Sequence, residues 1–345
     1  MSVTTTEFLN GLLVDGVPTM GMGGLPLTSG RVIFVDYLNG SDGYPGTASQ
    51  PMKTIYRAYA TARDGYNDTI VIEGNGITTA TQRLSLDNAV AVDPTATAGT
   101  LVLNKNAVHI IGMSAPSPNS RARFAPPTGT YTMATFGSGN FVTMSGSGCI
   151  ISNVAFFNGF STGGASQICF TVTGGRNYFN NVMFGGAGDA ASAQATTSRS
   201  LLINSSSGEN RFYQCQIGLD TVTKTVANAS LELAGATARN EFINCTFPFY
   251  TSSATTIGIL GTGAGCIDRT TLFSGCVFDN AAQSGSTTMN GLATLPASAG
   301  GYLLMKSCSM IGITEFGTDA TTRGQMYVDG GAPTAATSGI AVNPT

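Results

Sequence analysis

The feature that most constrains this chain is a six-residue motif that returns about every 30 residues. In each copy the first, fourth and sixth residues are apolar, and the third is compatible with a turn. The copies are ISNVAF (151–156), FNNVMF (179–184), FYQCQI (212–217), FINCTF (242–247), FSGCVF (273–278) and MKSCSM (305–310), with a weaker one at HIIGMS (109–114). A steady period of this length predicts an architecture of stacked repeats.

The motif breaks the alternation of a straight strand. Phe242 and Cys245 are three residues apart and would point to opposite faces, whereas Cys245 and Phe247 share a face. A sharp bend at Asn244 would turn all three inward, and asparagine tolerates the left-handed backbone region. The aligned positions are Asn153, Asn181, Gln214, Asn244, Gly275 and Ser307. The asparagines either stack as a hydrogen-bonded ladder or are unrelated loop residues.

Short strand-like runs precede several copies, at 168–175, 201–208 and 231–238, and Gly or Ser ends each run. No long amphipathic helix fits within a unit. A propeller blade would need about 40–50 residues, and its usual Trp signature is impossible because the chain has no Trp. We therefore predict an all-β fold, a right-handed single-stranded parallel β-helix solenoid with three short strands per coil.

The fourth residues of the motif predict an interior column. Its members are Val154, Val182, Cys215, Cys245, Cys276 and Cys308, separated by 28, 33, 30, 31 and 32 residues. Neighbouring coils would bring cysteine Cα atoms about 4.8 Å apart, which permits a disulfide by distance alone. The odd total of seven cysteines and the absence of an export signal favour free thiols in a reducing compartment instead.

Charged residues fall into the same register. Arg176, Glu209 and Arg239 lie six positions before the column, and Arg211 and Glu241 lie four before it. Both sets have outward parity, so we expect surface ion-pair ladders of small energetic weight.

The chain divides into three parts. We predict that residues 1–30 form an extended N-terminal arm, that residues 31–313 form the β-helix, and that residues 314–345 form a C-terminal cap or tail. A capping helix is predicted near 51–64, with Pro51 at its first position and Gly65 as its stop. Ile55, Tyr59 and Ala62 would share its buried face.

Composition excludes some classes of function. Charged residues make up 10% of the chain and the net charge is −3, against a usual charged fraction of about 25%. Without a basic tract, binding to nucleic acid through its phosphates is not expected. No run of about 18 apolar residues exists that would span a membrane.

The acidic residues do not predict a catalytic pair. Glycoside hydrolysis needs two carboxyl groups about 5–9.5 Å apart. In the repeat register Glu209 and Glu241 lie beside arginines, and Asp220, Asp268 and Asp279 have no acidic partner at matching positions. A pair assembled across coils or between subunits stays open.

The remaining polar motifs favour structural roles. His109 is the only histidine, which excludes sites built from histidine clusters and favours a structural residue in a strand. Asp36, Asn39 and Asp42 are possible calcium ligands, but they lack EF-hand spacing, and a plain turn is the favoured interpretation. We expect no catalytic, cofactor or metal residues.

A family resemblance adds to this interpretation. The stretch from RVIFVDYLNGSDGYPG through KTIYRAY to DTIVIEG gives a strand, a glycine-rich turn, a capping helix and a strand, and VHIIGM and ISNVAFF continue the pattern. This order resembles right-handed parallel β-helix proteins of the pectate-lyase-like superfamily and, more narrowly, those of tailed-bacteriophage virions. The resemblance covers roughly 31–313, and it implies a tailspike, head decoration or fibre, often trimeric.

These observations lead to one hypothesis and two alternatives. The hypothesis is a non-enzymatic capsid decoration or head-spike protein, assembled in the host cytoplasm. It would dock as a homotrimer on other virion proteins, chiefly the major capsid protein, through its terminal arm. The alternatives are a tailspike adhesin or polysaccharide depolymerase that engages a host surface glycan, and a non-viral β-helix adhesin.

Overall fold

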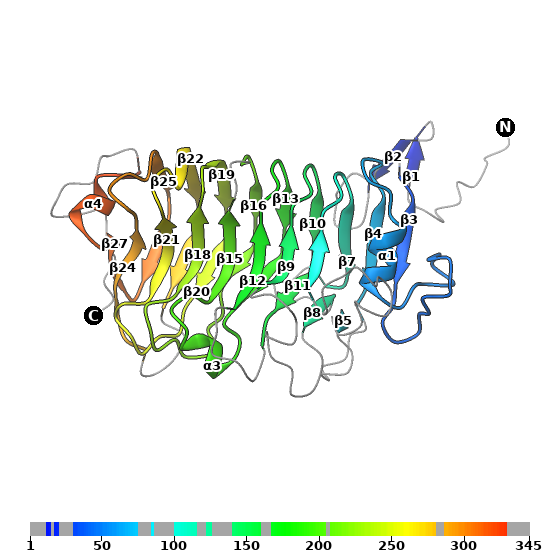
Figure 1. The fold of residues 1–345 in the computed structure, drawn as a ribbon, viewed down its shortest axis with the longest axis horizontal. Helices are drawn as coiled ribbons and strands as arrows, with labels where there is room; N and C mark the ends of the chain where they lie inside the picture. The colour runs from blue at the N-terminus through cyan, green and yellow to red at the C-terminus, as the bar shows by residue number, and fades with distance from the viewer. Residues whose placement is uncertain are drawn as a thin grey trace, which may run out of the picture.

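The protein is a parallel β-helix, in agreement with the predicted fold (Figure 1). The computed structural model describes residues 12–14, 17–20, 30–74, 84–85, 100–115, 122–125, 140–159, 167–204, 208–280 and 286–329. Each coil passes through three parallel sheets in turn, and successive coils add one strand to each sheet. The strands are short because the chain must turn at three corners per coil.

Over the residues that the structure describes, the first sheet has ten strands and the other two have eight each. The first contains β3 (Val32–Val35), β4 (Thr69–Glu73), β7 (His109–Met113), β10 (Ile150–Ser152), β13 (Tyr178–Asn180), β16 (Arg211–Tyr213), β19 (Thr237–Ile243), β22 (Ile267–Ser274), β25 (Tyr302–Lys306) and β28 (Met326–Val328). The second contains β5 (Leu84–Ser85), β8 (Arg123–Ala125), β11 (Ala155–Phe157), β14 (Met183–Gly185), β17 (Gln216–Ile217), β20 (Thr246–Pro248), β23 (Val277–Asp279) and β26 (Ser309–Ile311). The third contains β6 (Leu101–Leu103), β9 (Asn140–Met144), β12 (Ile168–Val172), β15 (Arg199–Asn204), β18 (Ala229–Ala234), β21 (Ile257–Thr262), β24 (Met289–Thr294) and β27 (Ile313–Gly317).

The bend between the first and second sheets lies at the residues aligned with Asn244. All six have a positive φ: Asn153 57°, Asn181 51°, Gln214 52°, Asn244 53°, Gly275 63° and Ser307 51°. Their backbone N–H groups bond to the next coil, for example from Asn244 to the Ser274 carbonyl at 2.8 Å. Among the described bend residues, a side-chain rung joins only Asn181 Nδ2 to Asn153 Oδ1, at 2.8 Å. The left-handed backbone is therefore regular, and the amide ladder is a single step.

The interior is a set of columns. The rings of Phe179, Phe212, Phe242 and Phe273 stack with centroids 4.6, 4.6 and 4.8 Å apart. Beside them lies the column of Val154, Val182, Cys215, Cys245 and Cys276, all buried, with Cys308 partly exposed at its end. Each cysteine of this column donates its thiol to a phenylalanine carbonyl one coil back, as Cys245 does to Phe212 at 3.4 Å. All seven cysteines are free thiols.

The N-terminal end is closed by helix α1 (Ile55–Thr61) and the segment before it. The helix begins later than the predicted Pro51, because the Thr54 side chain is its N-cap and accepts the Arg57 N–H at 3.2 Å. The residues just before the helix bond to the outer edge of β3, where Met52 pairs with Val35. This edge of the sheet is therefore already covered.

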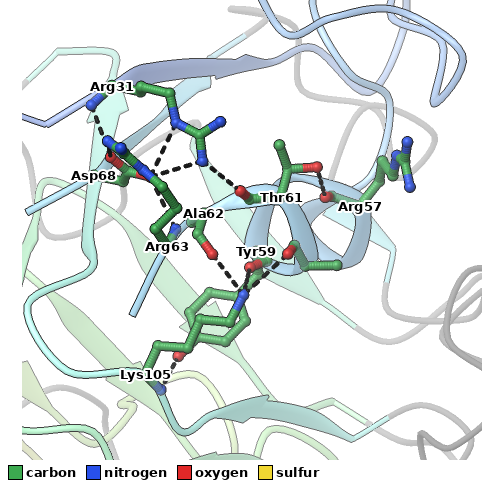
Figure 2. Close-up of polar contacts among 9 residues, drawn as sticks. Arg31, Arg57, Tyr59, Thr61, Ala62, Arg63, Asp68 and Lys105 are labelled. Atoms are coloured by element: carbon green, nitrogen blue, oxygen red, sulfur yellow. Dashed lines mark hydrogen bonds and ion pairs between the residues drawn. The ribbon is translucent and has the colours of Figure 1, made fainter. Parts of the chain in front are cut away.

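Two charged residues fasten this cap, as Figure 2 shows. Lys105 Nζ donates to the carbonyls of Tyr59, Ala60 and Ala62 at 2.6, 3.0 and 2.6 Å, so a cation lies at the C-terminus of α1. Asp68, whose side chain is fully buried, forms ion pairs with Arg31 and Arg63.

The β-helix continues past residue 313, where the sequence placed its end. Strand β27 completes the coil that β25 and β26 begin, and helix α4 (Ala320–Arg323) leads into β28, which pairs with β25 as the first strand of a further coil. At the other end, the arm contains the antiparallel pair β1 (Leu12–Val14) and β2 (Val17–Met20). Residues 330–345 and the rest of the arm lie outside the described residues. A short helix α3 (Ala190–Ala193) packs beside the coils, and no described helix has the length and apolar character needed to cross a membrane.

Candidate functional site: a charged groove at the coil corner

A polar groove runs along the corner where the third sheet leads back into the first. Its volume is about 320 Å³. The residues that line it are four small ones, Ser147, Gly175, Gly208 and Ala238, and five charged ones, Arg176, Glu209, Arg239, Asp268 and Arg269. The groove crosses successive coils and is therefore elongated along the axis of the β-helix.

The charged residues are presented by an unusual backbone. Arg176, Glu209, Arg239 and Arg269 have φ of 57°, 63°, 46° and 75°. Residues other than glycine rarely adopt this left-handed region, and such residues gather at functional sites as well as at tight turns. Here they place one long charged side chain per coil on the outside of the corner.

The predicted charge ladder is present. Glu209 accepts Arg176 Nε at 2.7 Å through Oε2, while its Oε1 bonds Arg239 Nη2. Hydrogen bonds from Arg176 and then Arg239 hold the pKa of Glu209 below its ordinary value. The second predicted pair, Arg211 with Glu241, forms at 2.6 Å on the outer face of the first sheet, away from the groove. Both oxygens of Glu209 are engaged with arginines, so this carboxylate is suited to charge pairing and poorly suited to proton transfer.

A β-bulge interrupts the ladder at its C-terminal end. Ala238 pairs with Asp268 and Asn240 pairs with Thr271, so the single residue Arg239 faces two residues, Arg269 and Thr270. Bulges re-aim side chains and are frequent beside functional sites. Because of the bulge, Arg239 on one coil faces Arg269 on the next coil, so two positive charges are neighbours.

A buried asparagine ladder that the sequence analysis missed supports the groove from below. Asn177 Oδ1 accepts the Cys149 N–H at 2.9 Å, Asn210 Oδ1 accepts that of Asn177 at 3.1 Å, and Asn240 Oδ1 accepts that of Asn210 at 3.2 Å. The ladder ends where Asn240 Nδ2 and Thr271 Oγ1 are buried without a hydrogen-bond partner. The signal was available, because these asparagines recur five positions before the interior column.

The sequence left His109 and the Asp36 turn open to structural or functional roles, and both make hydrogen bonds that hold the fold. His109 Nδ1 accepts the Ile150 N–H at 3.0 Å, and burial lowers its pKa to about 4. Asp36 accepts the N–H groups of Leu38 and Asn39, while Asp42 binds the backbone ahead of α1. Within the described ranges, no three His, Cys, Asp or Glu residues are grouped to hold a metal ion.

Of the remaining predicted acids, Asp268 lies in the groove, whereas Asp220 and Asp279 do not line it. One acidic pair was missed. Asp36 directly follows Val35 of β3, and Glu73 follows Ile72 of β4, to which Val35 is paired. Burial raises the pKa of Glu73, and the negative charge of Asp36 raises it further. The two carboxyl groups are therefore close enough for their charges to interact at the N-terminal end of the first sheet.

Lys224 is a second buried ionisable group that sequence reasoning missed. Its Nζ donates to Ser230 Oγ at 2.8 Å and lies 5.3 Å from the Phe249 ring centroid. Burial, with a smaller contribution from the charge of Arg199, lowers its pKa to about 7. Arg199 is paired with Glu232 at 2.6 Å. Among the described residues, no acidic side chain forms an ion pair with Lys224.

Comparison with known proteins supports the fold. No family model and no curated protein matches the chain. Among solved structures, pectin methylesterase PemA from Erwinia chrysanthemi is 16% identical with a TM-score of 0.53, and the match covers 91% of this chain and 92% of that one. A pectin methylesterase mutant solved with a hexasaccharide is 15% identical over the same shares, with a TM-score of 0.50. At such low identity, these polysaccharide-acting enzymes show the shared pectate-lyase-like β-helix fold alone.

Proposed function

We propose that this chain is a structural protein of a bacteriophage particle, a capsid decoration or head-spike protein in which the β-helix acts as a rigid shaft. The proposal follows from the resemblance in residues 31–313 and from the way the shaft is built. Its partners would be the major capsid protein and two further copies of the chain. The N-terminal arm would make the contact with the shell.

The observation that carries the proposal is the use of the charged residues in the groove. Both oxygens of Glu209 are bound by Arg176 and Arg239, and its pKa is lowered. Together with the stacked phenylalanines and thiols, this pattern ties each coil to the next. Such nearest-neighbour ties produce a stiff, elongated body.

Isolation of particles would test this proposal. We expect the chain to co-purify with virions through density gradients, and antibody labelling with electron microscopy to place it on the head. Truncation of residues 1–30 should release it from the particle while the isolated shaft stays folded. Labelling only at the tail tip would refute the decoration role, and absence from virions would refute the structural role as a whole.

A second candidate is a polysaccharide depolymerase, which the Asp36–Glu73 pair favours. Asp36 and Glu73 each follow a residue of the register pair Val35–Ile72 on adjacent strands, and glycosidases likewise use two neighbouring carboxyl groups. A raised pKa suits Glu73 to the role of a general acid. Polysaccharide-acting neighbours with the same fold are compatible with this function.

Incubation with purified capsular and O-antigen polysaccharides would decide between the two. A depolymerase would release new reducing ends, and Glu73→Gln would abolish that release, whereas Glu209→Gln would not. If the unmodified protein releases no ends from any glycan of the host, the depolymerase proposal fails and the structural proposal is unaffected.

A further inference from the structure

The bulged end of the corner groove carries positive charge that the ladder does not match. The order along the corner is Arg176, Glu209, Arg239 and then Arg269. The first three alternate in sign, but the fourth repeats the sign of the third. Like charges opposite each other on neighbouring strands are destabilising, so this position stands out in a surface otherwise built from opposite-charge pairs.

No acidic side chain of the described coils forms an ion pair with Arg269. Asp268 precedes it and takes the register position of Ala238, and neither Asp268 nor Arg269 forms an ion pair there. Glu209 cannot serve both sides, because its two oxygens are already bound by Arg176 and Arg239. The three arginines and two acids that line the groove, +3 and −2, give it a formal charge of +1 at neutral pH.

The geometry of the two arginines suits a bound anion. Arg239 uses Nη2 for Glu209, and the contacts of the described residues leave the other donors of its guanidinium group for a ligand. Adjacent coils lie about 4.8 Å apart, so one oxyanion with several acceptor oxygens can meet both forks at once. Arginine prefers such bidentate contacts with carboxylate, sulfate or phosphate groups.

We propose that the Arg239–Arg269 end of the groove binds an oxyanion, either free in solution or carried on an extended glycan that lies along the corner. The groove runs parallel to the axis of the β-helix, so a polymer would follow the coils and place its charged group at the bulge. This inference does not rest on a virion role, because it is measured on the isolated protein.

Titration calorimetry of the full chain at low ionic strength would test the site. The probes are inorganic sulfate for a free ion, dextran sulfate for an anionic glycan, and neutral dextran as the uncharged control. We expect the charged probes to bind and Arg269→Gln to weaken them about tenfold, as loss of one charge-assisted contact would. Arg211→Gln, which breaks an exposed ion pair outside the groove, should leave binding unchanged.

The outcomes separate the two sources. Binding of both charged probes supports a site for any oxyanion, and binding of dextran sulfate alone supports the extended glycan. If neither binds better than neutral dextran, or if Arg211→Gln weakens binding as much as Arg269→Gln, the proposal is overturned.

A second variant tests the unmatched charge without a ligand. Arg269→Glu would restore the alternation of charge beside Arg239. We expect it to raise the melting temperature at low salt and to abolish binding of the charged probes. A lower melting temperature in a correctly folded Arg269→Glu protein would remove the electrostatic basis of the site.

Discussion

Asp68 in the N-terminal cap and Glu209 in the corner groove are both carboxylates bound by two arginines. The Asp68 side chain is fully buried, whereas 31% of the Glu209 side chain is exposed. Asp68 also accepts the backbone N–H groups of Arg31 and Arg63, each at 2.8 Å. The two sites have the same set of charges, one carboxylate and two arginines. They differ in how much water reaches the carboxylate.

The comparison shows how burial converts an ion pair into a structural fastener. Burial by itself raises the pKa of Asp68, but hydrogen bonds from Arg63 and Arg31 outweigh it and hold the pKa well below the ordinary 3.8. At Glu209, water screens the same contacts, so the arginines stay available to other anions. In the cap, the charges are paired with one another and stabilise the fold. In the groove, part of the positive charge has no acidic partner.

The strongest test of this contrast is Asp68→Asn. It leaves Arg31 and Arg63 beside a neutral amide, so we expect a loss of roughly 2–4 kcal/mol in the free energy of unfolding. This range already allows for solvent screening of the two arginines, which are about half exposed. Urea unfolding would measure it. The matched variant Glu209→Gln should change stability much less. Equal losses at the two positions would show that burial does not distinguish them.

The same residue predicts a pH dependence. A carboxyl whose pKa is lowered in the folded state adds stability above its unfolded pKa and loses it as pH falls toward the folded value. We therefore expect stability to decline as pH drops below about 4, and Asp68→Asn to flatten that decline.

Lys224 sharpens the comparison, since it is a buried cation for which the described residues provide no acid. Its folded pKa of about 7 lies below the ordinary 10.5, so stability should rise with pH between these values and be lowest at or below neutrality. Lys224→Met should raise stability at pH 6 by roughly 2–3 kcal/mol after allowance for the lost Ser230 hydrogen bond. Unfolding free energies measured between pH 6 and 10 would show the wild-type slope and its removal. A slope that persists in the variant would contradict the assignment.

A backbone test extends the contrast to an uncharged position. Asn244 has φ of 53°, and Asn244→Val would strain a β-branched residue in the left-handed region by roughly 1–3 kcal/mol. Asn244→Gly is the control and should be nearly neutral, because glycine adopts this region freely. Thermal unfolding would compare them, and equal melting temperatures for Val and Gly would exclude strain at the bend.

The smallest effect is expected at the exposed pair of Arg211 and Glu241. Arg211→Ala should cost about 0–1 kcal/mol at low salt and less at high salt. Thermal melts at two salt concentrations would measure it. A loss as large as that of Asp68→Asn would mean that exposed ladder pairs also fasten the coils.

Sequence reasoning identified the ladders that repeat and overlooked groups that occur once. The period of the motif predicted the inward Phe242 and Cys245, the bend at Asn244 and the ion pair of Arg176 with Glu209. The meeting of Asp36 with Glu73 was not visible, because these residues lie outside the repeat and 37 positions apart. The buried asparagine ladder was visible in register but was overlooked beside the charged column next to it.

The amino-acid sequence is enough to predict a coiled chain, because inward and outward residues recur at a period that stacked strands of similar length can satisfy. The places where that regularity fails depend on contacts between coils. The bulge that faces Arg239 with Arg269 arises from one extra residue in β22, and its consequence appears only when β19 lies beside it. The burial of Asp68 and Lys224 likewise depends on segments that fold over them. Long-range packing sets the dielectric around a charge, and local sequence does not record it.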